Sequence, residues 1–209
     1  MAGNIYHIKT LSAGTAISDI DWNAVPAVEV RHYLWFEDYA PAVTARLVFL
    51  PDYGFVLHME CAESHPRAIY TAYMDPVYTD SCMEFFADWL SDGRYINFEM
   101  NANGALLSCV GADRHTRTPV AEFLAGRYFP VSSEVREDHW SVTAEIPLSM
   151  LSAILGVGAI KVEPGFAFRG NFYKCGDNTE KVHYGMWNPV GTEKPDFHRP
   201  EYFGELIVD

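Results

Sequence analysis

Apolar and polar residues alternate along much of the chain, and this two-residue period is typical of β-strands with one buried face. Residues 94–101 show it most clearly, because Ile96, Phe98 and Met100 fall on one face and mainly polar residues fall on the other. Residues 139–146 alternate in the same way. Further segments with strand-like sequences are 43–50, 55–61, 81–88, 105–110, 166–175 and 203–208.

Turn residues separate several of these segments, whereas helical patterns are scarce. Residues 51–54 (PDYG) fit a tight turn between two strands, and residues 102–104 (ANG) fit a hairpin. Short helices are expected only near 119–125 and 147–151, each beginning at a proline. The pattern predicts an all-β fold, an antiparallel β-sandwich of the immunoglobulin or jelly-roll type with one or two short helices.

The organisation of the chain predicts a single domain over residues 1–209, because no linker-like stretch interrupts it. Residues 176–202 form a long polar and aromatic stretch without clear alternation. A connection of that length in a compact domain is usually functional or wraps around the sheet.

The net charge limits the kinds of partner that the protein is expected to bind. The chain has 15 Lys and Arg residues against 28 Asp and Glu residues, a net charge of −13. Nucleic acids and anionic membranes require a basic surface, which this sequence lacks, so neither is expected as a partner. No apolar stretch is long enough to span a membrane, and the first 22 residues do not resemble a signal peptide. A soluble, cytoplasmic protein is therefore expected, or an extracellular one if a leader has been removed.

Familiar catalytic and metal-binding motifs are absent from the sequence. The four cysteines are widely spaced, and the eight histidines show no zinc-binding spacing. Four reduced, mostly buried thiols are the simplest expectation. Neither a catalytic residue nor a cofactor is predicted. Three acidic residues in the late loop region offer oxygen ligands for calcium, or are simply solvated or cap turns: Asp177, Asp196 and Glu201.

Polar side chains on the faces of the predicted strands suggest a binding patch. Asn, Glu and Arg combine hydrogen-bond donors and acceptors in planar groups, which match the neighbouring hydroxyls of a sugar. Two aromatic residues, Tyr78 before the 81–88 strand and Trp187 in the late loop, would flank such a patch. Alternation alone is equally typical of any half-exposed strand, so a structural role stays open. The candidate polar residues are Glu84, Asn97, Glu99, Arg169 and Asn171.

Several motifs together resemble carbohydrate-binding module family 9. The run Asp80-Ser81-Cys82-Met83-Glu84-Phe85-Phe86 is similar to the "D-S-x-x-E-hydrophobic-aromatic" strand of that family. The similarity extends over about residues 25–208. It continues through residues 95–101, 140–147, 168–177, 183–189 and 195–204 in the same order.

The resemblance implies a β-sandwich that binds a mono- or oligosaccharide without hydrolysing it. In the family, two aromatic rings clamp a terminal, reducing-end sugar, polar side chains bind its hydroxyls, and structural calcium can be present. Carried over by position, Tyr78 and Trp187 match the rings and Glu84 matches the strand carboxylate. Arg169 or Asn171 matches a polar contact on a late strand.

Other functions remain open at this point. Glu84 and Glu99 would serve as the two carboxylates of a glycoside-active enzyme if they flanked a sugar. A sandwich can also bind a protein partner through an exposed aromatic patch. Haem ligation is conceivable through His58 and the methionines Met59, Met100 and Met186.

Overall fold

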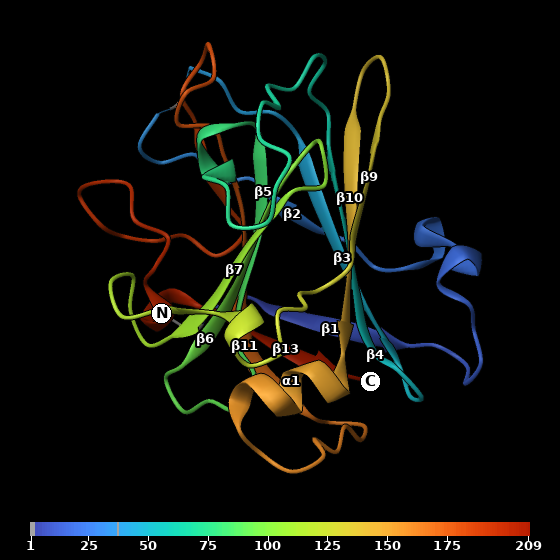
Figure 1. Cartoon of the computed structure of the whole chain (residues 1–209). Helices are drawn as coiled ribbons and strands as arrows, with labels where there is room; N and C mark the ends of the chain where they lie inside the picture. Colours follow the sequence, from blue (N-terminus) through green and yellow to red (C-terminus); the bar gives the residue numbers. More distant parts are fainter. Residues whose placement is uncertain (1–2, 37) are drawn as a thin grey trace.

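The structure is a computed structural model that describes residues 3–36 and 38–209 (Figure 1). One α-helix, α1 (Leu148–Leu155), is present in this part of the chain. Single turns of 3₁₀ helix occur at Ile17–Asp19, Trp22–Ala24, Val77–Thr79, Val120–Glu122 and Pro200–Tyr202. The strands are β1 (Ile5–Thr10), β2 (Val28–Val30), β3 (Val43–Leu50), β4 (Gly54–Cys61), β5 (Cys82–Asp88), β6 (Tyr95–Asn101), β7 (Leu106–Gly111), β8 (Thr118–Pro119), β9 (Val131–Val135), β10 (Trp140–Pro147), β11 (Ala167–Cys175), β12 (Tyr184–Met186) and β13 (Gly204–Val208).

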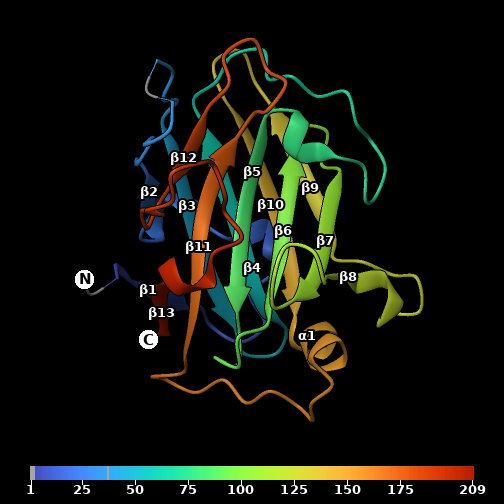
Figure 2. The same cartoon turned by 90° about the vertical axis from the view of Figure 1, so that its left-hand side faces the viewer.

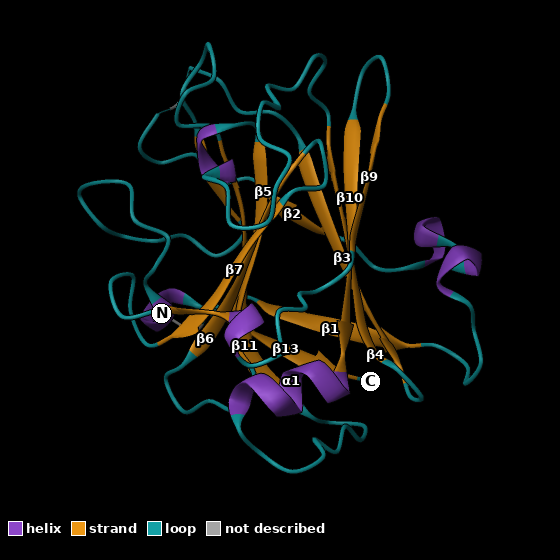
Figure 3. Cartoon of the chain, in the orientation of Figure 1, coloured by secondary structure: helices purple, strands orange, loops and turns teal. Residues whose placement is uncertain are grey.

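The strands form one continuous, curled sheet whose two halves face each other (Figures 1 and 3). Its strand order is β8-β7-β6-β5-β11-β13-β1-β3-β4-β10-β9, with β12 beside β11 and β2 beside β3. The predicted all-β class is therefore confirmed. The sheet is mixed, however, and differs from the antiparallel sandwich that the alternation predicted.

The parallel pairs involve the first strand. β1 pairs in parallel with β13 through Ile5–Ile8 and with β3 through Lys9 and Thr10. β1 and β13 lie at opposite ends of the chain, so no hairpin forces them to run in opposite directions. β1 thereby connects the two halves of the sheet.

Apolar side chains fill the space between the two halves. The inward faces of β5, β6 and β11 carry Phe85, Phe98 and Phe172, whose rings stack with centroid separations of 4.8 and 5.9 Å. Ile96 and Met100 lie in the same core, as their alternation predicted. Helix α1 begins after Pro147, as expected for the second helical segment, and closes one end of this core (Figure 1).

The outer face of β5, β6 and β11 is also covered, here by loops. Figure 2 looks onto this face and shows the segments after β7 and after β12 crossing in front of it. Every residue of β5 and β6 is buried, including the polar ones. The polar residues of these strands are therefore the floor of a covered region rather than a solvated surface.

Asp80 anchors one of the covering segments to the sheet. Its carboxylate accepts hydrogen bonds from the Arg67 guanidinium and from the backbone N–H groups of Ile69 and Tyr70, the latter two at 2.9 and 3.1 Å. The side-chain amide of Asn101 on β6 donates a further bond at 2.9 Å. This buried carboxylate fixes the chain two residues after Tyr78.

We expect Asp80→Ala to lower the free energy of unfolding by roughly 3–5 kcal/mol, because it leaves a partly buried guanidinium and two backbone donors without their acceptor. Urea denaturation of the purified variant measures this change. Asp92→Ala, which removes an exposed carboxylate paired with Arg94, is the control and should lower it by less than about 1 kcal/mol. Equal losses in the two variants would contradict the anchoring role of Asp80.

Candidate functional site

A cavity of about 390 Å³ lies over the outer face of β5, β6 and β11. Its floor consists of residues of these strands, and its walls come from the segments between strands and from Tyr184 at the start of β12. The floor includes Glu84 on β5, Glu99 on β6 and Cys175 on β11. Two consecutive strands and a third, β11, whose Cys175 lies 91 residues after Glu84, therefore meet under one opening.

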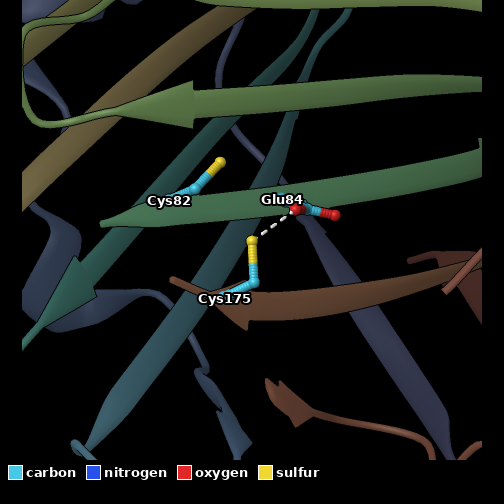
Figure 4. Close-up of side chains that lie close together, drawn as sticks. All are labelled: Cys82, Glu84 and Cys175. Atoms are coloured by element: carbon cyan, nitrogen blue, oxygen red, sulfur yellow. Dashed lines mark hydrogen bonds between the residues drawn. The ribbon is translucent and has the colours of Figure 1, made fainter. Parts of the chain in front are cut away.

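The two glutamates are direct neighbours across strands. Glu84 pairs with Glu99 on one side and with Tyr173 on the other, and both carboxylates are only 3% exposed. The thiol of Cys175 donates to the Glu84 carboxylate, with Sγ 2.9 Å from Oε1 (Figure 4). The floor is thus a line of adjacent hydrogen-bonding groups.

Arg117 balances the charge at the Glu99 end of this floor. Its Nη1 lies 3.5 Å from Glu99 Oε1 and donates to the Asn97 side-chain oxygen at 3.0 Å. The Asn97 amide in turn donates to Glu99 Oε1 at 3.1 Å. Asn97 therefore supports Glu99 and Arg117 without lining the cavity itself.

Burial keeps the carboxyl pair from ionising as free glutamates do. Removal from water, reinforced by the charge of Glu99, raises the pKa of Glu84 well above its usual value. Removal from water also raises the pKa of Glu99 to about 7, although Arg117 opposes the shift. At neutral pH the pair consequently carries less than two negative charges and offers both a donor and acceptors.

Aromatic rings form part of the walls. Tyr78, in the 3₁₀ turn before β5, is 36% exposed at the cavity. Tyr184 at the start of β12 also lines it. Phe197 lines it too and stacks on Tyr173, with ring centroids 4.1 Å apart. The cavity therefore combines a polar floor with apolar ring surfaces.

The structure brings some of the predicted site residues together and separates others. Tyr78, Glu84 and Glu99 line the cavity, and Asn97 lies beside them. Arg169 does not reach it, because its guanidinium donates to the carbonyl oxygens of Phe203 at 2.8 Å and Glu201 at 3.3 Å.

Asn171 and Trp187 also lie away from the cavity. Asn171 is fully buried, and its side chain bonds the backbone N–H and carbonyl of Asn188. Trp187 is 6% exposed and packs edge-on against Phe172 in the inner core. The predicted pairing of Tyr78 with Trp187 is corrected accordingly, because the two-residue period of β12 places Tyr184 outward and Trp187 inward.

The sequence reasoning missed eight residues that line the cavity, and five of them carry polar or aromatic side chains in its walls. Arg114 and Arg117 lie in the connection between β7 and β8, where no periodicity indicates a direction. Tyr184, Phe197 and His198 belong to the long aromatic segment that was singled out only as a whole. The alternation of Tyr184 with Met186 was the one local signal for its outward face.

In the part of the chain that the structure describes, the three acidic residues suggested for calcium do not come together as one group of ligand atoms. Asp177 and Asp196 line the cavity, but Asp196 lies between two arginines at 4.0 Å, and Glu201 bonds to Arg199. Within residues 3–36 and 38–209, the group of three metal-ligating side chains that comes together is Cys82, Glu84 and Cys175. Calcium takes about six to eight oxygen ligands, and the carboxylate of Glu84 is the one oxygen group in this set.

The residues considered for haem also point in different directions. His58 stacks on Trp22, with ring centroids 4.7 Å apart, whereas Met59 and Met100 are in the inner core. Met186 belongs to the outer cluster. These side chains therefore do not face a common pocket.

Comparison with known proteins identifies a family whose model matches this chain. A family model described as carbohydrate-binding family 9 matches residues 16–208, whereas no curated protein sequence matches the chain. A solved structure from Bacteroides uniformis ATCC 8492, described as a candidate carbohydrate-binding protein, is 28% identical, with a TM-score of 0.83 and coverage of 100% of both chains.

Two more distant structures show the same fold. They are complexes of a carbohydrate-binding module family 9 from Caldicellulosiruptor kristjanssonii. The glucose complex is 16% identical, with a TM-score of 0.69 and coverage of 99% of this chain and 96% of that chain. The cellotriose complex is 15% identical, with a TM-score of 0.66 and coverage of 98% and 93%.

The raised pKa of Glu99 predicts a pH dependence of stability. Its protonated form stabilises the fold fully below the unfolded pKa of about 4.5, and this contribution is lost as the pH rises through about 7. We therefore expect the free energy of unfolding of the wild type, measured relative to that of Glu99→Gln, to fall by on the order of 3 kcal/mol as the pH rises from about 4.5 to about 7.

Urea denaturation of both proteins across this pH range tests the expectation. Glu134→Gln, at an exposed position on β9, controls for the removal of a surface carboxylate. A difference between the wild type and Glu99→Gln that does not vary with pH would contradict the placement of Glu99 in a buried floor.

Proposed function

The chain belongs to carbohydrate-binding family 9, and we propose that its cavity binds the terminal sugar of a mono- or oligosaccharide without cleaving it. The observation that carries this proposal is the buried floor with Glu84 and Glu99, which Arg117 contacts from the wall, in a cavity that tyrosine side chains also line. The glucose and cellotriose complexes of the Caldicellulosiruptor module support sugars as the ligand class.

The floor has the chemistry to recognise adjacent hydroxyl groups. A sugar hydroxyl both donates and accepts, so it needs a partner of each kind. The guanidinium of Arg117 donates, ionised Glu99 accepts, and protonated Glu84 does both. These groups are held on strands and by mutual hydrogen bonds, so little side-chain freedom is lost when a ligand binds.

The rings provide the apolar part of the site. A pyranose has a face of C–H groups that packs on an aromatic ring. We assign this contact to Tyr78 and, in place of Trp187, to Tyr184 on the neighbouring wall. A volume near 390 Å³ is at the small end for ligand sites and favours one or two sugar units. We place the reducing end innermost on the family resemblance alone.

The arrangement of the carboxylates favours binding over hydrolysis. A glycoside hydrolase places its two carboxylates on either side of the scissile bond. Glu84 and Glu99 instead lie next to each other on adjacent strands of the same floor. We therefore propose a non-catalytic role, and release of reducing sugar from an aryl glycoside panel would overturn it.

We expect Tyr78→Ala to weaken sugar binding about tenfold, because stacking on a ring contributes roughly 1 kcal/mol or more. Tyr184→Ala should have a similar effect. The measurement is calorimetric titration with glucose, xylose, galactose, cellobiose and xylobiose, for which we expect micromolar to millimolar dissociation constants.

Tyr128→Ala is the matched control. Tyr128 is an exposed tyrosine, 48% accessible, that stacks on Tyr73 outside the cavity, and its removal should leave the affinity unchanged. The reduced alditols of the same sugars should not bind if the reducing end is recognised. No binding of any sugar, or equal losses in Tyr128→Ala and Tyr78→Ala, would contradict the assigned site.

A further inference from the structure

We infer that Cys82, Glu84 and Cys175 form a binding site for a thiophilic divalent cation such as Zn²⁺, at the part of the cavity floor that Glu84 and Cys175 line. Their ligand atoms, two sulfurs and a carboxylate oxygen, all lie within 4.8 Å of one another (Figure 4). All three residues are buried, and none forms a disulfide. The inference concerns a second ligand class and does not depend on sugar binding.

Strand register brings these donors together from positions far apart in the sequence. Cys82 and Glu84 are two residues apart on β5 and therefore share its outer face. Cys175 is the direct cross-strand partner of Cys82 on β11. The three donors are thus positioned by rigid strands rather than by loops, which suits a metal site with fixed geometry.

The spacing is compatible with tetrahedral coordination. Zinc binds sulfur at about 2.3 Å and carboxylate oxygen at about 2.0 Å, which places tetrahedral ligands roughly 3.5–3.8 Å apart. Small side-chain rotations would bring the three atoms to these separations. Glu84 and Cys175 line the cavity, so the fourth coordination position would face its interior.

The surrounding charges favour a cation. Glu99 is the direct cross-strand neighbour of Glu84, and the Asp177 carboxylate lines the same cavity, so both would attract a cation bound there. The nearby cation Arg117 is already engaged by Glu99 and Asn97. On binding, the metal would replace one proton on each thiol and the proton on Glu84, and these protons would pass to the buffer.

The donor set also selects the class of metal. Thiolate ligands suit Zn²⁺, Co²⁺ and Cd²⁺, whereas Ca²⁺ and Mg²⁺ prefer oxygen alone. Sulfur and carboxylate together therefore distinguish this site from a structural calcium site. An excess of Ca²⁺ should not compete with zinc.

Titration of the reduced, full-length protein with Co²⁺ in the absence of sugar tests the inference. We expect thiolate-to-cobalt charge-transfer absorption at one equivalent, abolished by Zn²⁺. Cys82→Ser and Cys175→Ser should each weaken binding at least about tenfold. Cys109→Ser, which alters another buried cysteine outside the group, should leave the affinity within about twofold of wild type.

X-ray absorption of the zinc-loaded wild type provides a readout that requires no variant. We expect two sulfur ligands at about 2.3 Å together with oxygen ligands at about 2.0 Å. A coordination shell without sulfur, or no thiolate–cobalt absorption, would overturn the inference. Loss of that absorption in Cys109→Ser with retention in Cys82→Ser and Cys175→Ser would also overturn it.

Discussion

The burial of both faces of β5 and β6 is the constraint on which the rest of the structure depends. The inner faces pack into the aromatic core, and the outer faces are covered by loops, yet those outer faces carry Glu84, Glu99 and other polar groups. An unpaired buried polar group lowers stability by roughly 1–3 kcal/mol, so each needs a partner. Cys175 and Arg117 supply these partners, and the resulting network is the floor of the cavity.

The same constraint explains why the site is pre-formed. The carboxylates are held by strands, by cross-strand neighbours and by hydrogen bonds to Cys175 and Asn97. Asp80 ties the segment carrying Tyr78 to β6 through Asn101. The buried polar groups of the floor therefore form hydrogen bonds with one another, which stabilises the fold. The same groups present donors and acceptors to a ligand.

Much of the fold follows from periodicity, because strands with an apolar inner face have a two-residue pattern. Ile96, Phe98 and Met100 are in the core as predicted, and α1 begins after Pro147. β9 was missed because its short sequence, VSSEV, places a serine between the two valines of one face, and most of the strand is exposed beside β10. β1 was missed because its short alternation, with Tyr6 and Ile8 inward, leaves the apolar Ile5 exposed.

The residues of the candidate site were predictable from the sequence only where the alternation along a strand indicates which face a side chain occupies. Glu84 and Glu99 occupy the outer face that alternation assigns to them. Trp187 was placed in the late loop because no strand was predicted over residues 184–186, and without that strand the sequence does not indicate that Trp187 points into the core. Arg117 reaches the floor from a connection that has no periodicity, so only the folded chain shows its pairing with Glu99.

The central claim is that the cavity over β5, β6 and β11 holds the sugar. Titration of ¹⁵N-labelled protein with glucose, followed by two-dimensional NMR, locates the binding surface directly. The account predicts that amide shifts concentrate at Tyr78, Glu84, Glu99 and Tyr184. Shifts concentrated around Trp187 and Arg169, or on the outer face of β3, β4 and β10, would contradict it.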